Sequence, residues 1–296
     1  MAFLRAIMND IAIIGAGKVG TVLGRALSRA GYRIIALTCS RISSARKSRK
    51  IIGQGTAYAD NIQASREADV VILAVQDMQI SRISEELSKS DIRWDGKYVF
   101  HCSGLLPSNI LDLLKNRGAF TASFHPIQSF TCKNQSEQSI EGIFFGIEGG
   151  KKSVLLAQEM TKRLGAKHLV LSPEDKSLYH TSCCLASNYI VALLDSASAV
   201  LGTIGIKPKQ AEEMLYPLVQ ETLQNVKKFG ISASLTGPIV RGDLETVKTH
   251  LKALKSLPGH SRIYRNLARQ AMETARKTKR LSTETIKALA ILLEDK

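Results

Sequence analysis

The chain has 296 residues, of which 44% are hydrophobic and 23% are charged, so its composition is that of a globular protein and excludes a disordered or fibrous one. At about 100–200 residues per domain, this length predicts two domains. We find no apolar run of the roughly 20 residues that cross a bilayer and no signal peptide in the opening MAFLRAIMND, and therefore expect a cytoplasmic protein without a membrane segment.

Basic residues dominate the charge of the chain. Lys and Arg total 41 against 26 Asp and Glu, which gives a net charge of +15. A basic chain attracts any anion, so charge alone does not separate a phosphorylated cofactor, an acidic metabolite and a nucleic acid. The five cysteines contain no Cys-x-x-Cys pair, and we expect neither a disulfide framework nor a metal site.

The first part of the chain alternates apolar strands with helices. We predict strands at 11–14, 33–38, 70–75, 98–102, 120–124 and 142–147, with helices after the first strand, in the forties, and at 80–87, 109–114 and 154–164. This alternation predicts a parallel sheet covered by helices on both faces. Residues 1–171 are therefore expected to form a doubly wound domain of the Rossmann type.

The rest of the chain has only helical patterns. Ser172 and Pro173 are typical of a helix start, and the stretch 174–201 has so few charges that we predict one long helix, buried on most sides. Further helices are predicted at 208–229, 243–256, 260–278 and 282–294. Residues 172–296 are expected to form an all-helical domain, and its nearly uncharged long helix suggests an interface, such as that of a homodimer.

A Gly-x-Gly-x-x-Gly motif follows the first strand and opens the first helix. Gly15 would allow a tight turn, Gly17 would let a pyrophosphate approach the backbone, and Gly20 would let helix and strand pack closely. The motif predicts a dinucleotide site. The cofactor contacts expected in this loop are Gly15, Ala16, Gly17, Lys18, Val19 and Gly20.

The end of the second strand distinguishes NAD from NADP. NAD-binding chains place an Asp or Glu there, whereas this chain has Ser40 and Arg41 and no acidic residue from Ile11 to Ala59. A carboxylate would repel a 2′-phosphate, and Arg can bind one with two parallel hydrogen bonds. We therefore predict NADP(H) as the cofactor, with Ser40 and Arg41 near the 2′-phosphate.

Two further strand ends should meet the same edge of the sheet, where ligands bind in doubly wound folds. The residues expected near the nicotinamide are Ala74, Val75, Asp77 and Ser103, and Ser103 is also a candidate for substrate binding. Asp77 could equally serve as the N-cap of the helix that follows.

Several polar residues are candidates for catalysis or substrate binding. His125 lies at a predicted strand end before Pro126. On a continuous helix, Lys176, His180 and Ser187 would share one face with Cys183, and Asn188 would lie about 80° from His180. A polar stripe on an apolar helix needs partners or a wet cleft, so a structural network between helices is the alternative. Arg241 could bind a substrate carboxylate, whereas Asp243 is expected to cap the next helix.

The segments GAGKVG, HCSGLLP, FHPIQSF, Lys176-x-x-Tyr-His to Ser-Asn-Tyr189, and LTGPIVRGD together resemble the Rossmann-like oxidoreductases with a C-terminal domain of unknown function 2520. The resemblance extends to the 6-phosphogluconate-dehydrogenase-like and ketopantoate reductase superfamily. It implies a two-domain, often dimeric enzyme with a Lys and an Asn from the first long helix in catalysis. Lys176 matches that Lys in type and place, and Asn188 lies further along than the usual spacing.

The sequence thus predicts an NADPH-dependent reductase of a small carbonyl acid, with ketopantoate as the substrate that the resemblance favours. Lys176 or His180 would be the proton donor, His125 an alternative donor or orienting group, and Asn188 a hydrogen-bond donor to the developing alkoxide. Arg241, Ser103 and Ser187 would bind substrate. An imine or 3-hydroxyacid oxidoreductase is a second hypothesis.

A hypothesis of another class is a protein that senses NADP or binds nucleic acid without turnover. It rests on arginines that would share one helix face, although Glu273 interrupts them, aromatic residues are only 5%, and no nucleic-acid motif is present. Nucleic acid is therefore not the expected partner. The arginines are Arg262, Arg265, Arg269, Arg276 and Arg280.

Overall fold

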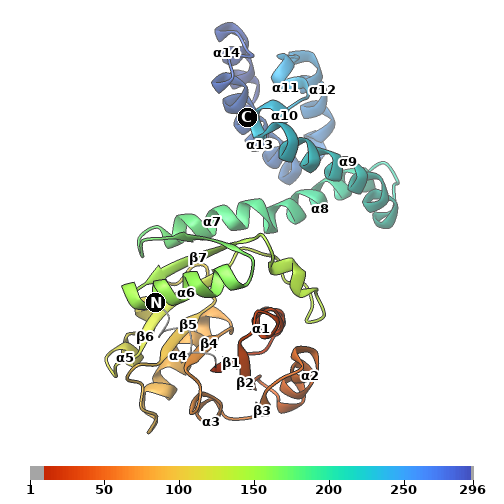
Figure 1. Ribbon diagram of the computed structural model, residues 1–296. Helices are drawn as coiled ribbons and strands as arrows, with labels where there is room; N and C mark the ends of the chain where they lie inside the picture. The colour runs from red at the N-terminus through yellow and green to blue at the C-terminus, as the bar shows by residue number, and fades with distance from the viewer. Residues whose placement is uncertain (1–9, 295–296) are drawn as a thin grey trace. The chain divides into compact units, whose positions relative to one another are not determined.

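The computed structural model describes residues 10–294 and divides the chain into two compact units, Met1–Ser187 and Asn188–Lys296 (Figure 1). The first unit is built on one eight-stranded sheet with the order β3-β2-β1-β4-β5-β6-β7-β8. Its strands are β1 (Asp10–Ile14), β2 (Arg33–Thr38), β3 (Thr56–Tyr58), β4 (Val70–Leu73), β5 (Tyr98–His101), β6 (Phe120–Pro126), β7 (Phe144–Gly149) and β8 (Lys167–Val170).

The strands from β3 to β6 are parallel, as the alternating pattern predicts, but β7 is antiparallel to β6 and β8 is parallel to β7. The chain enters β7 from the edge where β6 ends, without a helix that returns it to the opposite edge, so β7 must run back alongside β6. The short strands β3 and β8 were not predicted from the sequence.

Helices cover both faces of the sheet. The connecting helices are α1 (Lys18–Arg29), α2 (Ile42–Ile52), α3 (Asn61–Ser65), α4 (Asp77–Ser88), η2 (Ser108–Leu111), α5 (Asp112–Lys115), η3 (Glu137–Ile140) and α6 (Lys151–Arg163). Neighbouring residues of a strand point to opposite faces, so Ile11 and Ile13 belong to one core and Ala12 and Ile14 to the other. These two cores make the Rossmann unit doubly wound.

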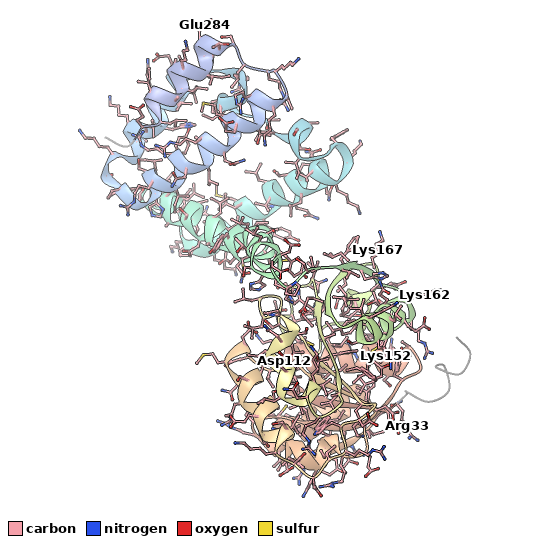
Figure 2. The ribbon with its side chains drawn as sticks, turned by 90° about the vertical axis from the view of Figure 1, so that its left-hand side faces the viewer. Arg33, Asp112, Lys152, Lys162, Lys167 and Glu284 are labelled. Atoms are coloured by element: carbon pink, nitrogen blue, oxygen red, sulfur yellow. The ribbon has the colours of Figure 1, made fainter. Side chains whose placement is uncertain are left out.

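Lysines border the far edge of the sheet. Figure 2 labels Lys152, Lys162 and Lys167 on α6 and β8. The Lys152 ammonium lies 4.6 Å from the ring centre of Phe120, and that of Lys167 lies 5.6 Å from the ring centre of Phe144. Lysine on an edge strand discourages pairing with another sheet, so this charge has a structural role at the β8 edge.

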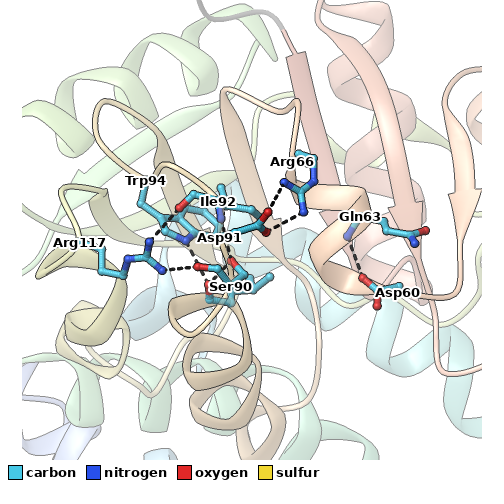
Figure 3. A network of polar contacts seen from close by, with 9 residues as sticks. Asp60, Gln63, Arg66, Ser90, Asp91, Ile92, Trp94 and Arg117 are labelled. Atoms are coloured by element: carbon cyan, nitrogen blue, oxygen red, sulfur yellow. Dashed lines mark hydrogen bonds and ion pairs between the residues drawn. The ribbon is translucent and has the colours of Figure 1, made fainter.

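A polar network fixes the loop that leads from α4 into β5 (Figure 3). Arg117 donates hydrogen bonds to the backbone carbonyls of Ser88, Ser90 and Ile92, and Arg66 pairs with Asp91 at 2.7 Å. Because the network surrounds the start of β5, it lies at the amino edge of the parallel strands. The opposite, carboxyl edge is where a doubly wound sheet binds its ligand.

The long helix expected over 174–201 is interrupted, and the expectation that it is buried on most sides is wrong. It forms α7 (Lys176–Ala186) and α8 (Asn188–Gly202), with Ser187 between them at φ −127° and ψ −75°. Lys176 is the buried residue of α7 and Ser196 that of α8. The stretch Lys176–Gly202 is long and apolar enough to cross a membrane by length and composition alone, contrary to the expectation that the chain has no such run.

The first unit also extends beyond the expected end at residue 171, because α7 belongs to the same unit as the sheet. Lys176 explains why α7 belongs to this unit, because its side chain is hydrogen-bonded to Ser103, which follows β5, and to Ser123 in β6.

The second unit is entirely helical in the residues described. Its core joins Val247, Met272 and Leu289, among others, and Asp243 caps α12 as predicted, because its carboxylate accepts a hydrogen bond from the Thr246 amide. The elements after α8 are α9 (Pro208–Phe229), α10 (Ile231–Ser234), α11 (Pro238–Arg241), α12 (Leu244–Ala253), η4 (Leu254–Ser256), α13 (Pro258–Lys277) and α14 (Thr283–Leu292).

Candidate active site

The glycine-rich loop joins β1 to α1 at the carboxyl edge of the sheet. Gly15 has φ +89°, and a Cβ there would lie 2.4 Å from Val75 Cγ1 and 2.8 Å from the Ala74 carbonyl oxygen. A Cβ at Gly20 would lie 2.6 Å from the Gly15 oxygen. The tight turn and the close packing that the motif predicts at these two positions are therefore both present.

At position 17, by contrast, no contact among the described residues requires a glycine. A Cβ built on Gly17 would come no closer than 3.9 Å to any other part of the chain, and its φ of −76° is open to all residues. Gly17 is the N-cap of α1, whose first turn has no acidic residue. Space above a helix N-terminus suits a pyrophosphate, so this loop fits a dinucleotide in the way the motif predicts.

Three side-chain hydrogen bonds hold the backbone of the loop in place. The Ala16 carbonyl accepts hydrogen bonds from Thr21 Oγ1 at 3.0 Å, from Cys39 Sγ at 3.0 Å and from Ser48 Oγ at 2.8 Å. Three donors on one carbonyl fix the orientation of the Ala16 peptide plane. The conformation of the loop is thus set by the protein before any ligand arrives.

The expected 2′-phosphate residues follow β2. Ser40 and Arg41 are exposed, and Arg41 is the N-cap residue of α2, whose first turn also has no acidic residue. An exposed guanidinium beside a helix N-terminus can receive a phosphate. Lys18 and Val19, at the start of α1, are exposed and half-buried respectively.

The ends of β4 and β5 meet through a hydrogen bond between side chains. Ser103 Oγ donates to Asp77 Oδ2 at 2.9 Å and accepts from the backbone amides of Leu105 and Leu106. Asp77 begins α4, but the N-cap is Gln76, so the capping role considered for Asp77 is not what the structure has. Ser103 and Asp77 organise the turn after β5.

Lys176 is the most buried charged group of this region, at 1% exposure. Its Nζ donates to the Ser103 carbonyl at 3.0 Å and to Ser123 Oγ, and Ser123 donates in turn to the same carbonyl. Burial lowers the pKa of Lys176 to about 8, and the nearby carboxylates of Glu148 and Asp77 oppose this shift. An ammonium has three protons, so two hydrogen bonds leave one available for transfer.

His125 is the penultimate residue of β6, close enough to Lys176 to feel its charge. Its Nδ1 lies 2.6 Å from the Tyr179 hydroxyl oxygen, and its ring centre lies 6.1 Å from that of His180. Burial, with the charge of Lys176 next, lowers the pKa of His125 to about 3, so the ring is neutral at physiological pH. Tyr179 was not predicted from the sequence, although it lies one helical turn after Lys176 and therefore on the same face of α7.

The structure brings together some of the expected residues. Lys176, His180, His125 and Ser103 converge in the first unit, with Cys183 on the same helix. Ser187 ends α7 outside its helical geometry, so the continuous stripe expected up to Ser187 is wrong: α7 carries only Lys176, His180 and Cys183. Asn188 and Arg241 belong to the second unit and are exposed there.

Most of the predicted arginine stripe on α13 serves the protein itself. Arg265 donates to the backbone carbonyls of Leu292 and Glu294, Arg269 donates to that of Leu293, and Arg276 pairs with Glu273. Arg280, after the helix, binds the carbonyl of Leu235 at 2.9 Å. Arg265 and Arg269 thus hold the end of α14, Arg280 holds the segment after α9, and Arg276 pairs within its own helix. Among the described residues, no cluster of three or more His, Cys, Asp or Glu side chains could hold a metal ion.

Comparisons with known proteins agree with this architecture. A Rossmann-like domain family matches residues 2–126, and the family called domain of unknown function 2520 matches residues 143–271. No curated protein matches the chain.

Solved structures extend the similarity along the chain. One is a protein of Bacteroides fragilis that is described as a candidate NADP oxidoreductase. It is 22% identical to this chain with a TM-score of 0.74, and the match covers 90% of this chain and 98% of that protein. Protein TM1727 of Thermotoga maritima is 25% identical with a TM-score of 0.70, covering 91% and 99%. A reductive aminase of Aspergillus terreus, solved with NADPH and ethyl levulinate, is 14% identical with a TM-score of 0.63, covering 96% and 99%. The chain is therefore similar to a Rossmann-like family over its first part and to the DUF2520 family over most of its second part, the two families that its motifs resemble.

Proposed function

We propose that this protein is an NADPH-dependent oxidoreductase that reduces the carbonyl group of a small acid. The observation that carries the proposal is Lys176, a buried ammonium with a pKa of about 8 that is hydrogen-bonded at the carboxyl edge of a sheet whose first loop fits a dinucleotide. A group whose pKa lies near the working pH is suited to proton transfer. The cofactor is supported by the similar structures, one of which contains NADPH and another of which is named for NADP.

NADPH, when bound, supplies the hydride. The loop Gly15–Gly20 receives the pyrophosphate, and Arg41 with Ser40 receives the 2′-phosphate. Lys176 donates the proton to the substrate oxygen, with His180 as the alternative donor. Ser103 and Ser123 hold the Lys176 ammonium in place through the hydrogen bonds described above.

Two residues predicted from the sequence are also proposed to bind the substrate. Arg241, an exposed cation, would bind the substrate carboxylate, and Asn188 would donate a hydrogen bond to the developing alkoxide. Replacing Arg241 with Ala should then raise KM for a carboxylate substrate and leave kcat largely unchanged, because the interaction is made equally in the ground state and the transition state. An unchanged KM would remove Arg241 from the site.

Ketopantoate is the substrate that we propose first, on the resemblance of the motifs. Imine reduction is the second candidate, because a reductive aminase and an imine reductase are among the proteins of similar structure. The test follows NADPH oxidation by the purified protein with ketopantoate, other 2-oxo and 3-oxo acids, and a cyclic imine acid. Turnover of the imine alone would replace the carbonyl proposal, and no turnover with any of them would contradict both.

We also propose that the enzyme is a cytoplasmic homodimer. All five cysteines are free thiols, which suits a reducing compartment. On α8, Tyr189, Val191 and Leu193 are 58%, 68% and 43% exposed, an apolar surface that a second copy would cover. The molecular mass in solution, measured by light scattering, tests this: a monomer at micromolar concentration would contradict it.

A further inference from the structure

The side chains of Tyr179 and His125 form a hydrogen-bonded pair between α7 and β6. The hydroxyl oxygen lies 2.6 Å from His125 Nδ1, and the two rings meet edge to face at 89°. Burial, and after it the neighbouring Cys183, raises the pKa of Tyr179, and the Gly146 backbone amide opposes this shift, so the phenol keeps its proton. The phenol therefore has a proton that it can donate to Nδ1, with the Cys183 sulfur as the competing acceptor.

A histidine that accepts at Nδ1 while neutral carries its proton on Nε2. The Nε2 edge of the ring faces Gly104: a Cβ built there would lie 2.8 Å from His125 Cε1 and 2.9 Å from Nε2. The preceding residue, Ser103, is the one whose carbonyl accepts from Lys176. The Nε2–H group and the Lys176 ammonium therefore both border the short segment after β5.

We propose that Tyr179 is a positioning residue that holds His125 as the Nε2–H tautomer, and that this N–H is a neutral hydrogen-bond donor to the oxygen of the carbonyl substrate beside Gly104. The identity of the acceptor rests on the proposed function, whereas the tautomer does not. A neutral imidazole can polarise a carbonyl without giving up its proton, which leaves proton transfer to Lys176.

Two glycines make room for this arrangement. A Cβ at Gly104 would also lie 2.6 Å from His180 Cδ2, and a Cβ at Gly146 would lie 2.4 Å from the Tyr179 oxygen. Neither glycine has the positive φ that would otherwise require it. Gly146 thus allows the tyrosine hydroxyl to reach His125, and Gly104 allows the Nε2 side of the ring to approach the segment after β5.

The test reads the tautomer directly by ¹⁵N NMR of histidine ring nitrogens in the full-length protein without substrate, with the His125 signals assigned by their loss in His125→Gln. Wild type should show protonated Nε2 and unprotonated Nδ1 at neutral pH. Tyr179→Phe should shift the Nε2–H to Nδ1–H ratio by about tenfold, the effect of one lost hydrogen bond. Gly146→Ala, which displaces the hydroxyl without removing it, should act in the same direction.

Tyr264→Phe is the matched control, because Tyr264 and His250 form a similar pair at 3.0 Å in the second unit. It should change the signals of His250 and leave His125 unchanged. Protonated Nδ1 at His125 in the wild type, or an unchanged His125 in Tyr179→Phe, would overturn the proposal.

Kinetics separate this inference from the proposed function. Once a substrate is found, Tyr179→Phe should lower kcat about tenfold with KM for NADPH unchanged, and Tyr264→Phe should not. Absence of any turnover in the wild type contradicts the proposed function and the substrate role of His125, while the tautomer result still decides the role of Tyr179. Normal kcat in Tyr179→Phe with a shifted tautomer would exclude His125 Nε2–H as the donor.

Discussion

Lys176 shows how burial prepares one side chain for chemistry. Its ammonium has lost most of its water, which lowers its pKa, yet it is still charged at neutral pH and is held by the Ser103 carbonyl and the Ser123 hydroxyl. An exposed lysine would keep its proton too firmly to donate it at neutral pH.

The first prediction concerns turnover and its pH dependence. Lys176→Ala should lower kcat by roughly 10²–10⁴-fold with NADPH affinity unchanged, the range typical of a lost general acid. In the wild type, kcat should fall as the pH rises through about 8, because the protonated form is the donor. Steady-state kinetics between pH 6 and pH 10 in about half-unit steps measures both effects.

His180→Ala is the comparison for that prediction, since the larger loss of turnover identifies the donor. If both variants keep nearly all of their turnover, the proton must come from elsewhere, and the polar face of α7 has only a structural role.

The second prediction concerns Arg41. NADPH should bind more tightly than NADH, and Arg41→Ala should remove about 1–3 kcal/mol of that preference, the worth of a charge-assisted hydrogen bond to a phosphate. Fluorescence titration of both cofactors measures it. Arg46→Ala, an exposed cation further along α2, is the control and should have little effect. Equal affinity of the wild type for both cofactors would contradict the prediction.

The third prediction concerns the fully buried His101. Burial lowers the pKa of His101 to about 3, against about 6.5 for an unfolded chain, and the Ser103 amide donates to its Nδ1 at 3.2 Å. The unfolded state therefore binds more protons between these values, and the free energy of unfolding should fall as the pH drops from 6.5 towards 3.

Urea unfolding of the wild type and of His101→Gln at several pH values between 7 and 4 measures this slope. The variant should lose less stability on acidification, by up to a few kcal/mol, and His125 should account for much of the remaining slope. His168→Gln, at an exposed position of β8, is the control. Equal slopes in all three proteins would show that His101 does not titrate in this way.

At the scale of elements, β1, its loop and α1 act as one rigid part. Gly20 lets α1 approach β1, since a Cβ there would meet the Gly15 oxygen at 2.6 Å and Ile13 Cγ2 at 3.0 Å. The first of these atoms belongs to the backbone and cannot rotate away.

The fourth prediction is that Gly20→Ala separates α1 from the loop and weakens NADPH binding more than it destabilises the fold. Forcing a methyl group into a packed contact costs about 1–3 kcal/mol. Calorimetry with and without NADPH measures both effects. Gly31→Ala provides a contrast, because Gly31 has φ +89° but open space around it, so that variant should lose stability through strain and keep its cofactor affinity.

At the scale of the whole molecule, the net charge of +15 gives the protein a field that favours anions. The fifth prediction is that Kd for NADPH rises when salt is raised from about 0.1 M to about 1 M, where the screening length falls from roughly 10 Å to 3 Å. NADH, which lacks the 2′-phosphate, should respond less. Isothermal titration measures both, and equal salt dependence of the two cofactors would contradict a cationic 2′-phosphate site.

The sequence by itself determined the parts of this protein that depend on neighbouring residues. The strand at 33–38, the helix at 208–229, the glycine loop and the Asp243 cap are all where local patterns predict them, because apolar periodicity and capping act over a few residues. The lack of acidic residues after β2, which led to the NADP hypothesis, is equally local.

Only the tertiary structure decided the features that depend on residues far apart in the chain. The reversal of β7 and β8 follows from where the chain re-enters the sheet, and the burial of Lys176 depends on Ser103 and Ser123, which lie 73 and 53 residues away. The pairing of Tyr179 with His125 spans 54 residues and requires Gly146 on a third element. Periodicity along a helix indicates which face is apolar, but the packed chain alone determines what each polar group meets and how its pKa is shifted.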